Sequence, residues 1–153
     1  MTLSDWVRNG WILPSPTTPA EIADLLALVD RDLSDSEAAG ISPDWRLNIA
    51  YNAALQAATA ALAASGYRAS RDQHHYRVIQ SLELTIGADP SLITRFDAFR
   101  KKRNFGGYER AGVVSDLEAN EMRELARKLD ADVRAWLRRH HPRLLPGSRQ
   151  SKP

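Results

Sequence analysis

The sequence predicts an all-α protein, an up-down bundle of about five helices, and three observations carry this prediction. Apolar residues recur with the three- and four-residue spacing of an amphipathic helix in each long segment. Helix-capping residues followed by proline or glutamate mark several helix starts. No segment alternates apolar and polar residues as a strand would. We therefore expect helices joined by short connections around one core.

Length and composition indicate a single ordinary domain. The chain has 153 residues, 43% of them hydrophobic and 26% charged, which is enough to bury a core. It has no cysteine, which excludes disulfides, Cys-based zinc sites and a thiol nucleophile. No apolar run approaches the roughly 18 residues of a membrane span, so we expect a cytoplasmic protein that does not enter membranes. We expect an irregular arm over 1–17, a helical bundle over 18–140 and a basic flexible tail over 141–153.

Two helices are expected in the first half of the chain. Thr18 caps the first, with proline at the next position and Glu21 completing a capping box. Ser42 and Pro43 open the second, and Gly66 ends it. Alanine fills much of the surface of this second helix, which lets neighbouring helices approach closely. It is therefore expected at the centre of the bundle.

Three more helices follow in the second half. The third runs from about His74 to Ile86, after a polar connection. Asp89 and a following proline start the fourth, which carries Leu92, Phe96 and Phe99 on one face and is interrupted by paired glycines. Ser115 and Glu118 form a capping box at the start of the last helix, which extends to about Arg139.

The net charge of +2 is unevenly distributed along the chain. From Arg134 onward the charged residues are five arginines and one lysine, and subtracting these six from +2 leaves −4 for the first 133 residues. A second basic cluster spans 100–103. Two basic clusters on a mildly acidic body suit a phosphate-bearing partner. The alternative is a solvated helix end and a disordered tail.

Arg103 is the candidate for phosphate binding. It continues the apolar series of the fourth helix by four residues, so its side chain is expected on the buried face. A buried arginine needs an anionic or hydrogen-bonded partner, and its planar guanidinium matches phosphate oxygens. Gly106 and Gly107 would let backbone N–H groups approach a phosphate. The alternative is a salt bridge from Arg103 to another helix and a simple glycine turn.

Three segments resemble the HEPN family of helical bundles, over roughly 45–137. They are the alanine-rich helix and glycine-tyrosine turn of Tyr51–Arg68, the histidine-led His74–Ile79, and Arg103-Asn104, which resembles the start of the family signature. The resemblance implies a helical bundle that forms a homodimer with a composite cleft. It also implies an RNA-directed protein, a metal-independent endoribonuclease of toxin–antitoxin or defence type, with no cofactor.

The family signature consists of an arginine, usually a polar residue next to it, and a histidine a few residues later. Carried over, Arg103 matches the arginine and Asn104 the polar residue. No histidine occurs between Arg103 and His140, and Tyr108 stands about where the family histidine belongs. Tyrosine, with an ordinary pKa of about 10, is a poor base beside histidine at about 6.5. The expected catalytic residues are thus Arg103, Asn104 and Tyr108.

Further basic residues and the paired glycines are expected to attract the RNA backbone. These RNA- or phosphate-binding candidates are Arg100, Lys101, Lys102, Gly106, Gly107, Arg138 and Arg139. His74 and His75 start a helix, where a structural role or an RNA contact is expected. Being adjacent, they point to different faces and cannot chelate a metal as an i, i+4 pair would, so no metal site is expected.

Two alternatives to the ribonuclease remain open. The first is a non-catalytic HEPN module that binds RNA or a nucleotidyltransferase-type partner, for which the missing histidine records lost chemistry. Tyr108 would then be a candidate modification site, by its position alone. The second is a purely structural bundle in which an acid of the same chain neutralises Arg103.

Overall fold

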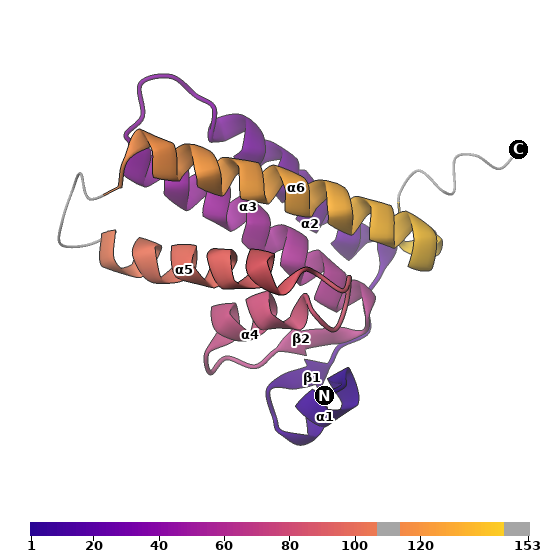
Figure 1. The fold of residues 1–153 in the computed structure, drawn as a ribbon. Helices are drawn as coiled ribbons and strands as arrows, with labels where there is room; N and C mark the ends of the chain where they lie inside the picture. Colours follow the sequence, from indigo (N-terminus) through magenta and orange to yellow (C-terminus); the bar gives the residue numbers. More distant parts are fainter. Residues whose placement is uncertain (107–113, 146–153) are drawn as a thin grey trace, which may run out of the picture.

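The computed structural model of the protein describes residues 1–106 and 114–145, with the side chains of 104–106 left out, and confirms an all-α fold. Six α-helices lie in this part of the chain, beside two short strands and a 3-10 helix (Figure 1). The elements are α1 (Leu3–Arg8), β1 (Ile12–Pro14), α2 (Pro19–Asp35), α3 (Pro43–Ala64), β2 (Tyr67–Ala69), α4 (His74–Ser81), α5 (Pro90–Gly106), α6 (Asp116–His140) and the 3-10 helix Pro142–Leu144.

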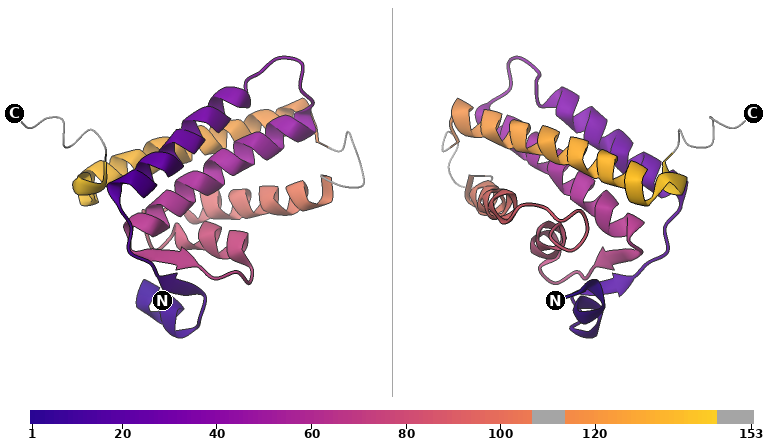
Figure 2. Two further views of the ribbon diagram at one scale, coloured as in Figure 1. Left: turned by 180° about the vertical axis from the view of Figure 1, so that it is seen from behind. Right: turned by 45° about the vertical axis from the view of Figure 1, so that its right-hand side comes forward.

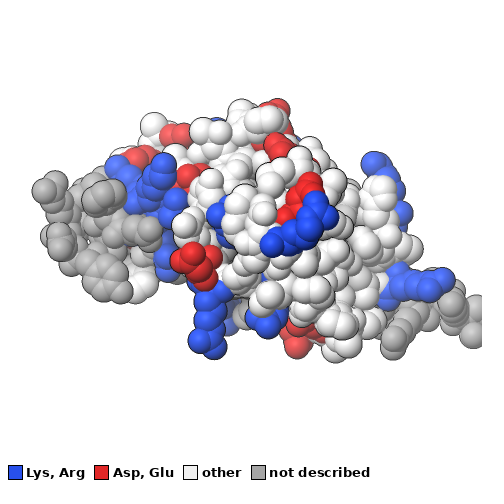
Figure 3. Space-filling view, turned by 90° about the horizontal axis from the view of Figure 1, so that it is seen from below, with Lys and Arg blue, Asp and Glu red and all other residues white. Residues whose placement is uncertain are grey.

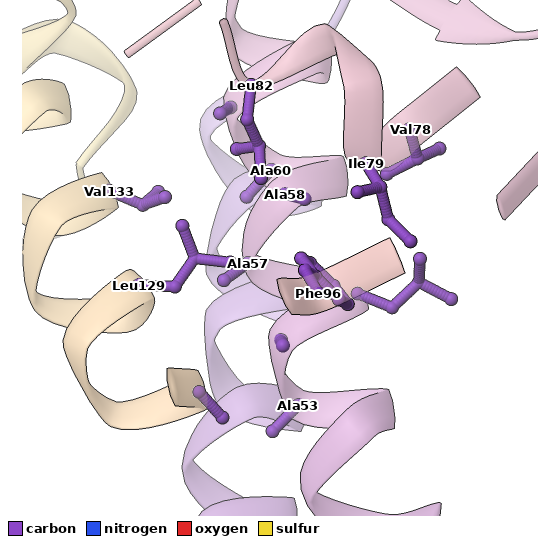
Figure 4. Close-up of a cluster of buried hydrophobic side chains, with 14 of the residues drawn as sticks. Ala53, Ala57, Ala58, Ala60, Val78, Ile79, Leu82, Phe96, Leu129 and Val133 are labelled. Carbon is purple, nitrogen blue, oxygen red and sulfur yellow. The ribbon is translucent and has the colours of Figure 1, made fainter. Parts of the chain in front are cut away.

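The alanine-rich helix α3 is the central layer, as the sequence predicts. Helices α2 and α6 lie on one side of it, and α4 and α5 on the other (Figures 1 and 2). Ala57 and Ala60 of α3 are fully buried, and Leu129 and Val133 of α6 lie beside this part of α3 (Figure 4). Phe96 of α5 packs from the other side (Figure 4). Small side chains on most of its surface allow α3 to be covered from both sides.

The four long helices alternate in direction along the chain, as an up-down bundle requires. Helices α3 and α6 run the same way, and α2 and α5 run oppositely (Figure 1). Arg46, near the start of α3, contacts Asp116 and Asn120 at the start of α6. Lys102 at the end of α5 pairs with Glu118 at 3.1 Å, which brings that end of α5 to the start of α6.

Most of the predicted helix starts are confirmed. The hydroxyls of Thr18, Ser42 and Ser115 each accept a backbone N–H three residues on. The capping box at Ser115 is present. The box predicted for Glu21 is wrong, because its carboxylate accepts a hydrogen bond from the Thr17 hydroxyl instead.

The prediction of an irregular arm and of no strands is corrected by the structure. Residues 3–8 form α1, which the reciprocal capping of Thr2 and Asp5 starts. Ile12–Pro14 then pairs antiparallel with Tyr67–Ala69, which lies inside the expected polar connection. Three residues per strand are too few for an alternating pattern to register in the sequence. Trp6 of this segment is buried in the hydrophobic core.

Two further boundaries differ from expectation. Helix α4 ends at Ser81 rather than near residue 86. The Ser81 hydroxyl donates to the carbonyl of Val78, and a turn follows Ser81. Of the segment 141–153, the structure describes 141–145, which includes the 3-10 helix and packs Leu144 and Leu145 against the core.

We predict that enlarging Ala57 destabilises the fold. Ala57→Leu should lower the free energy of unfolding by about 1–3 kcal/mol, because added methylenes in a filled interface force neighbours to shift. Ala57 is 0% exposed, whereas Ala131 of α6 is exposed. Urea denaturation followed by circular dichroism measures both variants. Equal stability of Ala57→Leu and Ala131→Leu would contradict close packing around α3.

Candidate functional site

Arg103 lies on the inner side of α5, over a buried aromatic ring. Its guanidinium carbon is 5.1 Å from the ring centroid of Tyr51 of α3, which is 1% exposed. Among residues 1–103 and 114–145, no carboxylate lies within salt-bridge distance of Arg103. The expected inward orientation is therefore observed, with a cation–π contact in place of an ion pair. A guanidinium held in this way keeps its N–H groups available to an anion.

Tyr51 also connects Arg103 to a histidine. Its hydroxyl oxygen lies 3.3 Å from Nδ1 of His75, in the first turn of α4. Phe96 of α5 fixes the tyrosine ring by an edge contact at 5.6 Å between centroids. The hydrogen bond orients the imidazole and leaves Nε2 of His75 for other partners. Three helices thus bring an arginine, a tyrosine and a histidine together.

The electrostatics of this cluster favour a neutral imidazole. Burial lowers the pKa of His75, and the positive charges of Arg103, His74 and Arg100 lower it further. Burial raises the pKa of Tyr51 to about 12, against the opposing effect of Arg103. Near neutral pH, Tyr51 is therefore an uncharged hydrogen-bonding group and His75 an uncharged imidazole. A neutral imidazole can accept a proton, which a general base must do.

A hollow of about 510 Å³ lies beside the cluster, between the start of α4 and the middle of α5. It is lined by Gln73, His74, His75, Tyr76, Asp97, Arg100 and Lys101. Gln73 at its rim has a φ of +52°, a left-handed backbone that side-chain-bearing residues adopt at some energetic cost. Residues in such conformations are frequent at binding sites.

The basic cluster over 100–103 is largely neutralised. Asp97 pairs with Arg100 at 2.7 Å and with Lys101 at 3.7 Å, and Lys102 pairs with Glu118. Seen from below, lysine and arginine atoms are spread over this face from one end to the other, with acidic atoms close to several of them (Figure 3). The free positive charge expected from the sequence is reduced, and Arg103 is the member without a carboxylate partner in the described part of the chain.

The structure does not bring Arg138 and Arg139, which were also predicted to bind RNA, to this hollow. Arg138 and Arg139 lie at the far end of α6, twenty residues beyond Glu118, which is roughly 30 Å along a helix. Gly106 ends α5. Gly107, Tyr108 and the side chain of Asn104 lie outside the described residues.

The second histidine at this site has a structural contact of its own. Nδ1 of His74 lies 3.1 Å from the carbonyl oxygen of Ser70, so this nitrogen carries the proton and donates it. The ring centroid of His74 is 6.0 Å from that of His75. Both expectations for this histidine, a structural role and a place at the binding surface, are thus compatible with its position.

Sequence reasoning missed the pairing of Tyr51 with His75. The two residues come from different helices and are separated by 24 positions. A signal was present, because Tyr51 is a polar aromatic side chain on the buried face of an alanine-rich helix. The hydroxyl of a buried tyrosine usually finds a hydrogen-bonding partner, which points to a polar group on a neighbouring helix.

Neither a metal site nor a membrane span is found among the described residues. No group of three or more potential ligands among the described residues could hold a metal ion. None of the helices in residues 1–106 and 114–145 has the length and apolar character needed to cross a membrane. Comparison of the chain with family models, curated proteins and solved structures gave no match.

We predict that Arg103→Ala raises the pKa of His75. The positive guanidinium disfavours the charged imidazole, so its removal lets His75 accept a proton at higher pH. An NMR titration of the histidine ring signals between about pH 4 and 8 measures this shift. Arg95→Ala is the matched control, since Arg95 is exposed on the same helix. An unchanged His75 pKa in Arg103→Ala would place Arg103 away from the imidazole.

Proposed function

We propose that this protein is a HEPN-like, RNA-directed protein that cleaves RNA without a metal ion and acts as a homodimer. The observation that supports the proposal is the placement of Arg103 and His75 against the same buried tyrosine. A cation for phosphate and a neutral imidazole are the two groups that metal-free RNA cleavage needs most. The resemblance of the sequence to the HEPN signature supports the same class of reaction.

In the proposed reaction, His75 takes the role that the signature histidine has in the family. Nε2 of His75 accepts the proton of a ribose 2′-hydroxyl, and the 2′-oxygen attacks the adjacent phosphorus. Arg103 stabilises the negative charge of the phosphorane. The bond from phosphorus to the 5′-oxygen then breaks. That oxygen takes up the proton that Nε2 of His75 accepted, passed on through a water molecule, leaving a cyclic phosphate and a 5′-hydroxyl.

Tyr51 positions both groups rather than reacting. Its pKa of about 12 keeps the hydroxyl uncharged near neutral pH, and in the proposed role its oxygen accepts the proton of His75 Nδ1, which leaves Nε2 unprotonated and able to act as the base. Its ring face holds the guanidinium of Arg103. Asn104 and Tyr108 remain candidates for further contacts to the phosphate, and a second copy of the chain would complete the cleft.

We predict that the purified protein cleaves total RNA in EDTA, and that Arg103→Ala and His75→Gln each reduce the rate by about 10²–10⁴-fold, typical of lost general acid–base or electrostatic catalysis. Denaturing gels of RNA incubated with each variant measure the rate. Arg95→Ala should cleave like the unaltered protein. Absence of cleavage by the unaltered protein, or equal cleavage by Arg103→Ala, would refute the ribonuclease proposal.

A non-catalytic module is the second candidate, and one observation favours it. Three of the four basic residues over 100–103 have acid partners. In this case the hollow binds RNA, or a nucleotidyltransferase-type protein, without turnover. Specific binding of RNA together with no cleavage would select this candidate.

We predict that either candidate binds an oligonucleotide more tightly as the pH falls. A phosphate beside Arg103 offsets the positive charges that lower the pKa of His75, so the bound state has the higher pKa. The added affinity is full below the pKa of free His75 and is lost as the pH rises through the pKa of the complex. Fluorescence anisotropy with a labelled 2′-deoxy oligonucleotide measures it. His75→Gln should remove the pH dependence. An affinity of the unaltered protein that does not change with pH would contradict the predicted role of His75.

A further inference from the structure

A second hollow, of about 290 Å³, lies at the other end of α5, between the turn before that helix and the second half of α6. Its lining includes Gly87 and Asp89 from the turn and Asp132, Trp136 and Arg139 from α6. None of these residues lines the first hollow. The volume is at the lower limit of small-molecule pockets, which run from about 300 to 1,000 Å³. It therefore suits a single ring system.

Trp136 provides a flat, half-buried surface at this hollow. Its ring is supported by His141 and His140, whose centroids lie 4.8 Å and 6.0 Å away. The indole is thus held in place before any ligand arrives, so little side-chain entropy is lost on binding. Indole faces stack well on planar heterocycles, nucleobases above all.

The charged groups around the ring are nearly balanced. Asp89 and Asp132 supply two carboxylates, and Arg139 supplies one guanidinium. Lys128 binds Oδ2 of Asp132 at 3.0 Å. The backbone N–H of Ser91 donates to Oδ1 of Asp89 at 2.9 Å, which lowers the pKa of that carboxyl. Asp89 is thus an ionised acceptor near neutral pH, and the two carboxylates are balanced by Arg139 and Lys128, so the surroundings favour an uncharged ligand.

We infer that this hollow binds a guanine base. Guanine presents adjacent N–H donors on one edge, which carboxylates accept, and two acceptors on the other, which arginine contacts in a bidentate manner. Asp132 and Asp89 match the first edge, Arg139 the second, and Trp136 the ring face. Adenine and cytosine lack the adjacent ring N–H and amino donors. The site is independent of the proposed phosphate chemistry at Arg103.

Guanosine is the probe, because it carries no phosphate for Arg103 to bind. The chain has four tryptophans, so ¹H–¹⁵N NMR gives four indole N–H signals, and the variant Trp136→Leu assigns one of them. Guanosine is expected to shift the Trp136 signal saturably and to leave the Trp45 signal in place. Inosine, which lacks the 2-amino donor, should bind roughly tenfold more weakly.

Variants separate this site from its surroundings. Trp136→Leu and Asp132→Asn should each weaken guanosine binding about tenfold or more, as expected for loss of a stacking ring or an acceptor. Trp45→Leu and Arg95→Ala remove an exposed ring and an exposed charge elsewhere, and should bind within about twofold of the unaltered protein, because neither residue lines the hollow. Retention of the remaining indole signals shows that each variant is folded.

Two results would overturn the inference. One is a Trp136 signal that neither guanosine, up to its solubility limit, nor UUGUU moves, and the other is equal binding of the same ligand by folded Trp136→Leu, measured by calorimetry because this variant lacks the reporter signal. Arg103→Ala should bind guanosine normally, so failure here and failure of the ribonuclease proposal are distinguishable. The pentanucleotides UUGUU and UUCUU identify the source of the base. A shift with UUGUU alone indicates guanine within RNA, and a shift with guanosine alone indicates the free nucleoside.

Discussion

The close packing of helix α3 is the constraint on which the rest of the molecule depends. Its alanines leave the helix little wider than its backbone, so other helices can cover it from both sides. Dispersion attraction grows with the number of close atom pairs, and a helix surrounded in this way exposes almost no surface to water. Helices α4 and α5 therefore have a fixed surface against which their own side chains are set.

Tyr51 turns this packing into a site. On this alanine-rich helix, one large polar ring reaches both His75 of α4 and Arg103 of α5. The same burial that raises its pKa also lowers that of His75, because both effects come from disfavouring charge in the interior. Tyr51 thus both packs between the helices and affects the electrostatics of the cluster, so α3 supports the fold and also contributes a polar group to the candidate site.

The fold followed from the sequence further than the site did. Capping at Ser42 and Ser115 and the apolar series of α5 depend on neighbours within a few residues, which a linear reading captures. The pair of Tyr51 and His75, and the neutralisation of Lys102 by Glu118, depend on how helices meet. Such contacts are set by tertiary packing, and the spacing of residues along one helix does not specify them.

The inward direction of Arg103 was predictable because it continues the series of Leu92, Phe96 and Phe99. Its partner was not, since a buried arginine is satisfied equally by an acid or by an aromatic ring with an anion beside it. The ends of α6 show the same limit. The two basic clusters were expected to attract the same RNA backbone, although Arg138 lies roughly 30 Å along α6 from Glu118, the partner of Lys102.

The short pairing of β1 with β2 has a consequence for the order in which the molecule forms. It joins Ile12 to Ala69, so the arm gains its main partner only after the whole of α3 has been synthesised and folded. Contacts between residues so far apart in the chain form slowly, because the intervening loop must close first. Residues 3–14 are thus synthesised before α3 but dock after it has folded. Until they do, the surface around Arg77, on which Trp11 stacks at 3.8 Å, stays open to solvent.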